Sequence, residues 1–388
     1  MKILHFSTWQ TGGAAKAADR LSSALIELGH DSKVVHMTSR LPAYFDAAIG
    51  KLTNDYNPIF HSYNYFPDNF RQIIKKESPD IIHIHWIGAG FVRPESLANC
   101  PVPIVWTLHD LWPLLGAEHL PLDTSRMVGG YLPTNRSQNE IGLDLNRWVW
   151  ERKSKYWSNT RINFIAPSNY VYELAKLAYQ MRESNKINQI YNFLSDDYEP
   201  NVDIGIKEKN GILVVASNLD NDSNKGLDLL IRALNQLPRD IVRNTSITII
   251  GAKSIEDKNL NNFKKIELIS SVSSDKDLAS FYQNASVTIV PSRNETLSYV
   301  AMESLSCGTP VVAFNVGGIP ELVVHNKKGY LAKPYDIADL ATGITKILSD
   351  QILRKKLSSN GILHIKNNFS KAKIVTEHLA LYNSLLNR

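Results

Sequence analysis

The sequence predicts an α/β protein with two domains, each built around a doubly wound parallel sheet. Short apolar runs alternate with amphipathic helical stretches in both halves of the chain, which is typical of strands that are buried on both faces. A polar segment from Ser195 to Asn210 separates the two halves and is interpreted as the linker. The length of 388 residues also suits two domains of ordinary size better than one core.

The first domain is expected over residues 1–193. After a strand at Ile3–Phe6, the turn Thr11–Gly13 leads into a helix that Gly29 closes. Residues 115–147 follow no regular pattern and are interpreted as an insertion or a loop. Further strands are predicted at Lys33–His36, Ile81–His85, Ile104–Leu108 and Ile162–Ala166.

The second domain is expected over residues 194–370, and residues 371–388 are expected to form a last helix. Two late amphipathic helices are predicted, Asp336–Leu348 and Ser370–Leu386. Two such domains are expected to face a central cleft, because α/β sheets bind ligands at the carboxyl ends of their strands. The predicted strands are Gly211–Ala216, Ser246–Ile250, Ser286–Val290 and Pro310–Phe314.

Composition excludes several classes of function. The net charge is only +5, without a basic stripe interleaved with aromatic residues, so nucleic-acid binding is not expected. No apolar run of about 18 residues occurs, so no transmembrane helix is predicted. Only Cys100 and Cys307 are present, which argues against a disulfide framework or a thiolate metal cluster and for a cytoplasmic location. Arg71, Lys75 and Lys76 could contact an anionic inner-membrane surface, although a solvated helix face explains them more simply.

Glu295 and Glu303 are the most informative pair in the chain. Seven residues separate them, and the segments Cys307–Ala313 and Gly317–Glu321 follow. At about 100° per residue, eight helical positions return the second side chain to nearly the same face as the first. Two carboxylates so placed could accept hydrogen bonds from the hydroxyls of an elongated ligand. The simpler interpretation is two exposed acids near a helix end.

Other segments also point to a ligand with an anionic group. The Gly12–Gly13 turn opens a helix, whose first backbone amides favour an anion; it lacks the spacing of a dinucleotide-binding turn. Lys225 precedes Gly226 at another predicted helix start and could neutralise a leaving diphosphate. His109 follows a predicted strand. His83 and His85 share one face of the predicted strand Ile81–His85 and could be metal ligands, but no third ligand is evident.

The order of these motifs resembles the retaining glycosyltransferases related to glycogen synthase and sucrose synthase, known as glycosyltransferase family 4. The resemblance covers most of the chain and implies the GT-B fold, with two Rossmann-like domains. It also implies that the last helix, residues 371–388, packs back on the first domain. It implies that Glu295 and His109 touch the transferred sugar, that Glu303 binds the ribose and that Lys225 meets the diphosphate. The implied donor-binding set is Gly12, Gly13, Asn218, Lys225, Arg293, Glu295, Thr296, Leu297, Ser298, Tyr299 and Glu303.

The sequence departs from that family in three places. The family usually carries an arginine about six residues before the lysine, and Leu219 stands there in this chain. Arg293 is a candidate replacement by position only, and without the arginine the two acids are expected to act as hydroxyl ligands rather than as ion-pair partners. Ser298 stands where relatives often have glycine. The segments Ile81–Trp86 and Val105–Trp112 look like the colanic-acid branch, but its cysteines are missing from residues 113–160.

The function predicted from the resemblance is transfer of a sugar, with retention of configuration, from a nucleoside-diphosphate sugar of the UDP or GDP type. The acceptor would be a growing surface polysaccharide, such as lipopolysaccharide, O-antigen or capsule, or a lipid-linked glycan. No metal or other cofactor is expected, because Lys225 and helix dipoles can balance the leaving charge. Two alternatives are a nucleotide-sugar epimerase on the same fold and a nucleotide-sugar-binding subunit that has lost catalysis.

Overall fold

The computed structural model describes residues 1–54, 60–120, 123–181, 186–200, 211–255 and 257–387. The chain divides into two compact units. The first contains Met1–Asn192 and Ala372–Arg388, and the second contains Phe193–Lys371. These limits lie within one residue of the domain boundaries expected from the sequence. Most of the expected linker, residues 201–210, lies outside the described residues.

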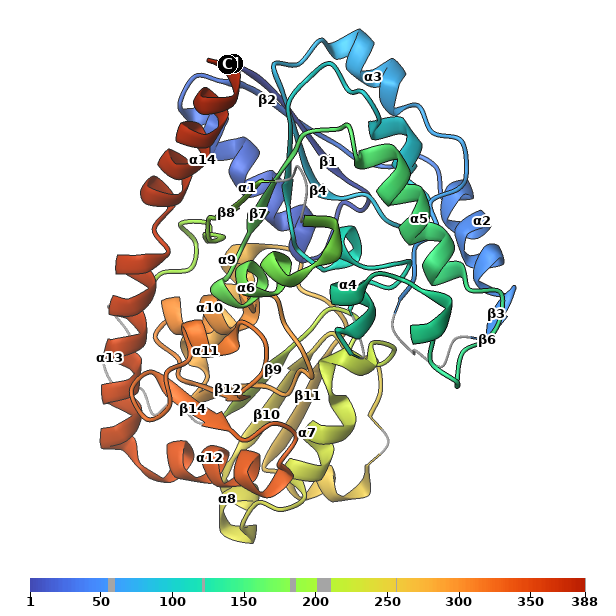
Figure 1. Ribbon diagram of the computed structural model, residues 1–388. Coiled ribbons are helices and arrows are strands. Elements are labelled where there is room, and N and C mark those ends of the chain that lie inside the picture. The colour runs from blue at the N-terminus through green and yellow to red at the C-terminus, as the bar shows by residue number, and fades with distance from the viewer. Residues whose placement is uncertain (55–59, 121–122, 182–185, 201–210, 256, 388) are drawn as a thin grey trace. The chain divides into compact units, whose positions relative to one another are not determined.

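Within the described residues, the first unit contains a six-stranded parallel sheet with the order β2-β1-β4-β5-β7-β8 (Figure 1). Its sequence order reverses between β1 and β4, and such a switch point is the usual ligand-binding position of a doubly wound sheet. The strands are β1 (Lys2–Ser7), β2 (Asp31–Val35), β4 (Ile81–Trp86), β5 (Ile104–Thr107), β7 (Ile162–Ala166) and β8 (Lys186–Gln189).

The helices of the first unit come from both ends of the chain. The last helix, α14 (Lys371–Leu386), buries Ile374 and Tyr382 and leaves Leu386 39% exposed. A short antiparallel ladder pairs β3 (Thr53–Asn54) with β6 (Ile141–Gly142). The other helices are α1 (Gly13–Glu27), α2 (Leu41–Gly50), α3 (Phe70–Glu77), η1 (Pro94–Leu97), η2 (Trp112–Leu114), α4 (Ser125–Gly129), η3 (Pro133–Asn135), α5 (Leu145–Trp157), α6 (Asn169–Leu177) and η4 (Tyr179–Met181), where η denotes a 3-10 helix.

The second unit repeats this plan in its described part, with the strand order β11-β10-β9-β12-β13-β14. The order reverses between β9 and β12, so the loops that follow these two strands meet at the switch point. All neighbouring strands are parallel. The strands are β9 (Ile212–Val215), β10 (Ser246–Ile250), β11 (Lys265–Ile269), β12 (Val287–Val290), β13 (Val311–Phe314) and β14 (Gly329–Ala332).

Polar side chains cap several of the helices of the second unit. Ser298 precedes α10, and its hydroxyl accepts a hydrogen bond from the backbone N–H of Ala301 at 3.3 Å. In the same way the Asp336 carboxylate, before α12, accepts from the backbone N–H of Asp339 at 3.0 Å. The sequence prediction missed α13, in which only Leu357, Gly361 and Ile365 are buried. The helices are η5 (Ser223–Lys225), α7 (Leu227–Leu234), α8 (Arg239–Asn244), η6 (Lys258–Asn262), α9 (Asp275–Asn284), α10 (Tyr299–Ser306), α11 (Ile319–Leu322), α12 (Ile337–Ser349) and α13 (Gln351–Asn368).

Candidate active site

Lys225 and Glu295 form an ion pair at the switch point of the second sheet. Lys225 ends η5 in the loop after β9, and Glu295 lies in the loop after β12. The Lys225 Nζ lies 2.9 Å from Glu295 Oε1, and the two side chains are 23% and 17% exposed. Glu295 is therefore an ion-pair partner, contrary to that part of the expectation, and its role as a hydroxyl ligand stays a prediction. Burial alone would lower the pKa of Lys225, but the negative charges of Glu295 and Asp222 outweigh it and raise that pKa.

Hydrogen bonds to backbone atoms hold these two loops together. The Asn224 side-chain amide donates to the Asn294 carbonyl oxygen at 2.8 Å, and the Arg293 N–H donates to the Asn224 carbonyl oxygen at 2.7 Å. Asn224, which precedes Lys225, is therefore bonded to Asn294, which precedes Glu295. Sequence reasoning did not find Asn224, because its partners are backbone atoms of a distant loop.

A third loop, which follows β13, supports the backbone of Glu295. The Gly318 N–H donates to the Glu295 carbonyl oxygen at 2.8 Å. Gly317 has a φ of +56°, and a Cβ at this position would lie only 2.2 Å from the same oxygen. Only glycine fits this close approach without displacing the Glu295 backbone. The Gly317–Gly318 pair thus shapes the loop that carries Glu295.

Arg293 is held outside the Lys225–Glu295 pair. Its guanidinium contacts both carboxylate oxygens of Asp228, at 3.0 and 2.7 Å, and donates to the Ser223 carbonyl oxygen at 2.6 Å. Hydrogen bonding to Asp228 raises the pKa of Arg293 further, and the same bond lowers the pKa of Asp228. In this arrangement Arg293 braces η5, and its charge is already balanced by a carboxylate.

Glu303 lies inside the second unit. It belongs to α10, is 3% exposed, and accepts a hydrogen bond from the Tyr282 hydroxyl at 3.0 Å. Burial first, and then the adjacent carboxylate, raise the pKa of Tyr282 well above its ordinary value. The helical spacing argument for the acid pair does not hold, because α10 begins at Tyr299 and Glu295 precedes it in a loop.

The other expected donor-binding residues surround the same loops. Ser298 caps α10 and Leu297 is 4% exposed, so both side chains face the interior. Thr296 and Tyr299 are partly exposed. Asn218 lies in the loop after β9 with a φ of +59°, and its side-chain oxygen accepts from the Asn221 amide at 2.9 Å.

In the first unit, Gly12 and Gly13 follow β1 and open α1. Gly12 is the N-cap residue, with a φ of +96° that favours glycine, and Gly13 is the first helical residue. The backbone amides of this first turn point out of the helix end, where an anion is favoured. The two glycines lie beside the switch point between β1 and β4.

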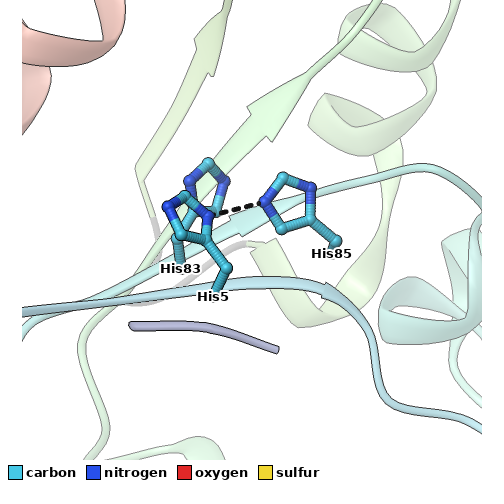
Figure 2. Close-up of side chains that lie close together, drawn as sticks. All are labelled: His5, His83 and His85. Atoms are coloured by element: carbon cyan, nitrogen blue, oxygen red, sulfur yellow. Dashed lines mark hydrogen bonds between the residues drawn. The ribbon is translucent and has the colours of Figure 1, made fainter. Parts of the chain in front are cut away.

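His109 follows β5 and belongs to a group of stacked and hydrogen-bonded imidazoles. Its Nε2 lies 3.0 Å from His85 Nδ1. Figure 2 shows the side chains of His5, His83 and His85 close together. Their ligand-capable nitrogens lie within 4.8 Å of one another. His5 is the third histidine that the sequence did not reveal; it pairs with His83 in the β1–β4 register. These three residues could hold a metal ion by distance alone.

Asp110, next to His109, begins a second hydrogen-bonded chain. Its Oδ2 lies 2.5 Å from His119 Nδ1, and His119 Nε2 lies 2.7 Å from the Ser62 hydroxyl. Ser62 is fully buried and also accepts from the Ala89 N–H at 2.8 Å. The connectivity is that of a hydrolase triad, but the buried serine oxygen has no path to a substrate. The chain therefore anchors the turn that carries His109.

Two family models together span most of the chain. The model "Glycosyltransferase Family 4" matches residues 11–198, and "Glycosyl transferases group 1" matches residues 199–364. The chain is a GT-B glycosyltransferase of this group 1 and family 4 type. An uncharacterized glycosyltransferase of Methanocaldococcus jannaschii is 24% identical over 406 residues, which cover 97% of this chain and 96% of that protein.

Solved structures agree with the fold of this glycosyltransferase. Sucrose-phosphate synthase from Thermosynechococcus elongatus superimposes with a TM-score of 0.71 at 18% identity, covering 100% of this chain and 99% of that one. The Anabaena protein HepE in complex with UDP-glucose superimposes with a TM-score of 0.68 at 17% identity, covering 99% and 100%. These likenesses bear on the fold alone.

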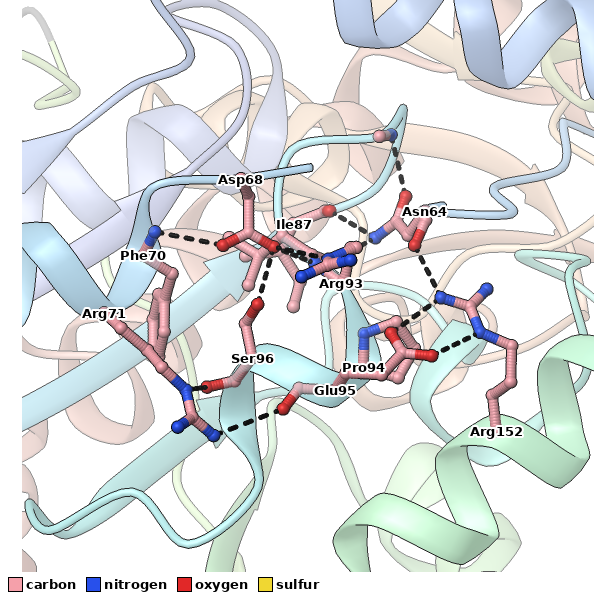
Figure 3. Close-up of polar contacts among 12 residues, drawn as sticks. Asn64, Asp68, Phe70, Arg71, Ile87, Arg93, Pro94, Glu95, Ser96 and Arg152 are labelled. Carbon is pink, nitrogen blue, oxygen red and sulfur yellow. Dashed lines mark hydrogen bonds and ion pairs between the residues drawn. The ribbon is translucent and has the colours of Figure 1, made fainter. Parts of the chain in front are cut away.

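The basic residues near α3 of the glycosyltransferase are partly committed to internal contacts. The Arg71 guanidinium donates to the carbonyl oxygen of Ser96 at 3.2 Å, as Figure 3 shows. It also donates to the carbonyl oxygen of Ala98 at 2.6 Å, so Arg71 secures the η1 segment. Lys75 and Lys76 are exposed on the last turn of α3. Among the described residues, no helix has both the length and the apolar character needed to cross a membrane.

Proposed function

We propose that this glycosyltransferase moves a sugar from a UDP- or GDP-type donor to a growing bacterial surface polysaccharide or lipid-linked glycan, with retention of configuration. The Lys225–Glu295 pair at the switch point of the second unit carries this proposal. It places a cation and a carboxylate together where a doubly wound sheet binds its ligand. The UDP-glucose named for the HepE structure supports a nucleotide-sugar donor of the UDP type.

In this proposal the second unit binds the donor. The Lys225 ammonium stabilises the charge that develops on the leaving diphosphate, as preorganised cations do in phosphate sites. Glu295 accepts hydrogen bonds from hydroxyls of the transferred sugar, and its contact with Lys225 keeps the lysine aimed at the same place. Glu303 binds the ribose. The Tyr282 hydroxyl donates a hydrogen bond to the Glu303 carboxylate and so holds it in position.

The first unit binds the acceptor in the proposed reaction. His109 touches the transferred group, and the acceptor hydroxyl attacks the face of the sugar from which the diphosphate leaves. No metal is required, because Lys225 and the amides at helix N-termini supply positive charge. We also propose that the protein acts in the cytoplasm, where the thiols of Cys100 and Cys307 stay reduced, and that Lys75 and Lys76 provide a peripheral membrane contact.

The alternative of a nucleotide-sugar-binding subunit that has lost catalysis is supported by the absence of the arginine that relatives carry before the lysine. Leu219, which stands in its place, is 2% exposed and packs in the core of the second unit. Arg293 does not replace it directly, because Asp228 holds its guanidinium. We therefore assign the diphosphate charge to Lys225, and the intact Lys225–Glu295 pair favours a catalytic protein over a binding subunit.

A thermal-shift screen of UDP, GDP and ADP sugars tests the donor class. A ligand at about 100 times its Kd adds roughly 2.7 kcal/mol to the free energy of unfolding, so a true donor raises Tm clearly. Donor turnover is then followed with and without acceptor, and NMR of the product reports the anomeric configuration. The proposal fails if no nucleotide sugar shifts Tm and none is consumed. An inverted product would refute retention, and sugar isomerisation without transfer would reveal an epimerase.

A further inference from the structure

Three imidazoles of the first unit are joined end to end across neighbouring strands. His109 Nε2 lies 3.0 Å from His85 Nδ1, and His85 Nε2 lies 3.1 Å from His5 Nδ1. The ring centroids of each pair are 5.3 Å apart. The distance between ring centres equals the N···N distance plus about two ring radii, where a radius runs from the ring centre to a ring nitrogen. This is the value expected when the two nitrogens lie on the line between the ring centres, so each hydrogen bond runs nearly along that line. Such alignment is the geometry of a strong hydrogen bond.

Strand order creates this row. β1, β4 and β5 are adjacent and parallel, so His5, His85 and the residue that follows β5 lie side by side near the carboxyl ends of their strands. The row therefore crosses the sheet, starts at His109, and ends at His5 in the interior. His5 is fully buried and His85 is 2% exposed.

Hydrogen bonding explains these histidines better than metal coordination does. His83 uses Nδ1 for the Tyr382 hydroxyl at 2.6 Å and Nε2 for the Thr107 hydroxyl at 2.8 Å. The His83 and His85 rings are also stacked, with centroids 4.3 Å apart and planes 28° apart. Imidazole lone pairs lie in the ring plane, so stacked rings do not converge on one ion as a tetrahedral site requires.

The buried end of the row decides which nitrogens carry protons. Among the described residues, His5 Nε2 is buried without a hydrogen-bond partner. A buried N–H without an acceptor is rarer than a buried acceptor without a donor, so His5 carries its proton on Nδ1 and donates to His85 Nε2. His85 then carries its proton on Nδ1 and donates to His109 Nε2. The proton of His109 is left on Nδ1.

Each ring of the row is neutral, so one of its nitrogens can donate a hydrogen bond and the other can accept one. Burial lowers the pKa of His109 to about 4, against the partial opposing effect of the Asp110 charge, and lowers the pKa of His5 to about 3. The other groups near the row are His83 and His378, whose pKa values burial also lowers. At neutral pH the row therefore holds one proton per ring.

We infer that His85 and His5 are positioning residues that fix His109 as the Nδ1–H tautomer, so that His109 acts as a hydrogen-bond donor to the transferred group and not as a general base. This inference rests on the proposed function, which places His109 beside the transferred sugar. A fixed donor selects an oxygen acceptor on the sugar, such as a hydroxyl or an acyl carbonyl. The row ends in the interior, so it orients a proton and does not conduct one to solvent.

Long-range 1H–15N correlation NMR of the ligand-free, 15N-histidine-labelled full chain tests the inference directly, because it reports which ring nitrogen is protonated. His85→Phe and His109→Ala spectra assign the signals. We expect Nδ1–H for His5, His85 and His109. An Nε2–H pattern at His109, or a doubly protonated ring at neutral pH, would overturn the inference. This measurement needs no substrate, so it stands apart from any failure of the proposed glycosyl transfer.

Variants then separate positioning from simple packing. His85→Phe fills the same space but removes both hydrogen bonds, so His109 should become a tautomer mixture and kcat should fall by about tenfold, equal to ~1.4 kcal/mol of barrier, with a smaller change in KM. His85→Asn keeps an amide near the Nδ1 position and should restore part of kcat. His83→Asn, on the same face of β4, should leave the His109 tautomer unchanged.

Two results of this series would contradict the inference. One is an unchanged His109 tautomer in folded His85→Phe. The other is stoichiometric zinc in the purified protein whose removal shifts the His5, His83 and His85 resonances, since that would assign these nitrogens to a metal site. If a variant does not fold, the tautomers of the wild-type chain still decide the question.

Discussion

The Nζ of Lys225 and Oε1 of Glu295 lie 2.9 Å apart although the two residues are 70 positions apart in the chain. Their loops follow β9 and β12, the two strands at which the order of the second sheet reverses. Asn224 and Gly317 hold the loops from either side. The ion pair is therefore a product of strand order, and it brings a positive charge to the acid that the sequence suggested as a sugar ligand.

A double-mutant cycle measures what this pair contributes. Lys225→Met and Glu295→Gln each leave one largely buried partner uncompensated, so we expect a coupling energy of about 1–3 kcal/mol in the free energy of unfolding. Chemical denaturation of the four proteins gives the value. The Arg293→Met and Asp228→Asn cycle is the control: this pair is 36% and 57% exposed and should couple by less than about 1 kcal/mol. Equal coupling in both cycles would contradict the buried character of the first pair.

Replacement of Glu303 should weaken nucleotide binding. Glu303→Ala removes the proposed charged hydrogen bond to the ribose, and such a loss costs about 1.5–3 kcal/mol. Isothermal calorimetry with the nucleotide measures the loss of affinity. Tyr282→Phe is the matched control, because it removes only the hydroxyl that holds Glu303 and should weaken binding less. Unchanged affinity in folded Glu303→Ala would exclude the ribose role.

Loss of the His109 imidazole should slow transfer. His109→Ala removes the proposed contact with the transferred group, so turnover should fall at least about tenfold, or ~1.4 kcal/mol of barrier. Steady-state kinetics with the donor found by the thermal-shift screen provide the measurement. Full turnover by a folded His109→Ala protein would remove this residue from the site.

The buried histidines should make the first unit sensitive to acid. Their folded pKa values lie below the ordinary value of ~6.5, so between these limits the unfolded chain binds protons that the folded chain does not, and stability falls as pH falls. Each such group contributes up to ~1.4 kcal/mol per pH unit in that window. The groups are His5, at about 3, His109 and His378, at about 4, and His83 and His85, well below the ordinary value.

Thermal denaturation between pH 7 and pH 4 tests this expectation. Asp46 acts in the opposite sense, because burial raises its pKa to about 6 and the folded chain then binds the extra proton. Burial raises the pKa of Asp19 as well, and these two carboxyls are outweighed by the group of histidines. His378→Gln should make the pH dependence shallower. Stability that stays constant or rises toward pH 4 would show that these rings are not held neutral in the folded protein.

Chelation should leave the proposed transfer intact. Lys225 and the helix N-termini carry the positive charge in the proposed reaction, so EDTA should not change turnover. The control is addition of manganese after chelation. Complete loss of activity that manganese restores would refute the metal-independent proposal.

Patterns local in the sequence predicted the strands β1, β2, β4, β5, β7, β9, β10, β12 and β13 and the helices α1, α12 and α14, but not the strands β3, β6, β8, β11 and β14. Runs such as Ile81–His85 and Ser286–Val290 are continuous enough to indicate buried parallel strands, and both strands form. The helix α13 was missed because few of its residues are buried, which leaves only a weak apolar period. The helical spacing assigned to Glu295 failed because Ser298 caps the helix one residue before Tyr299.

The sequence alone determined the α/β class, the two sheets and the order of the motifs, because these depend on local periodicity, turn residues and capping. Only the tertiary structure decided which distant side chains meet. The Lys225–Glu295 pair and the row from His109 through His85 to His5 depend on which strands are neighbours. Strand order is set by burial of the whole core, and no local pattern records it.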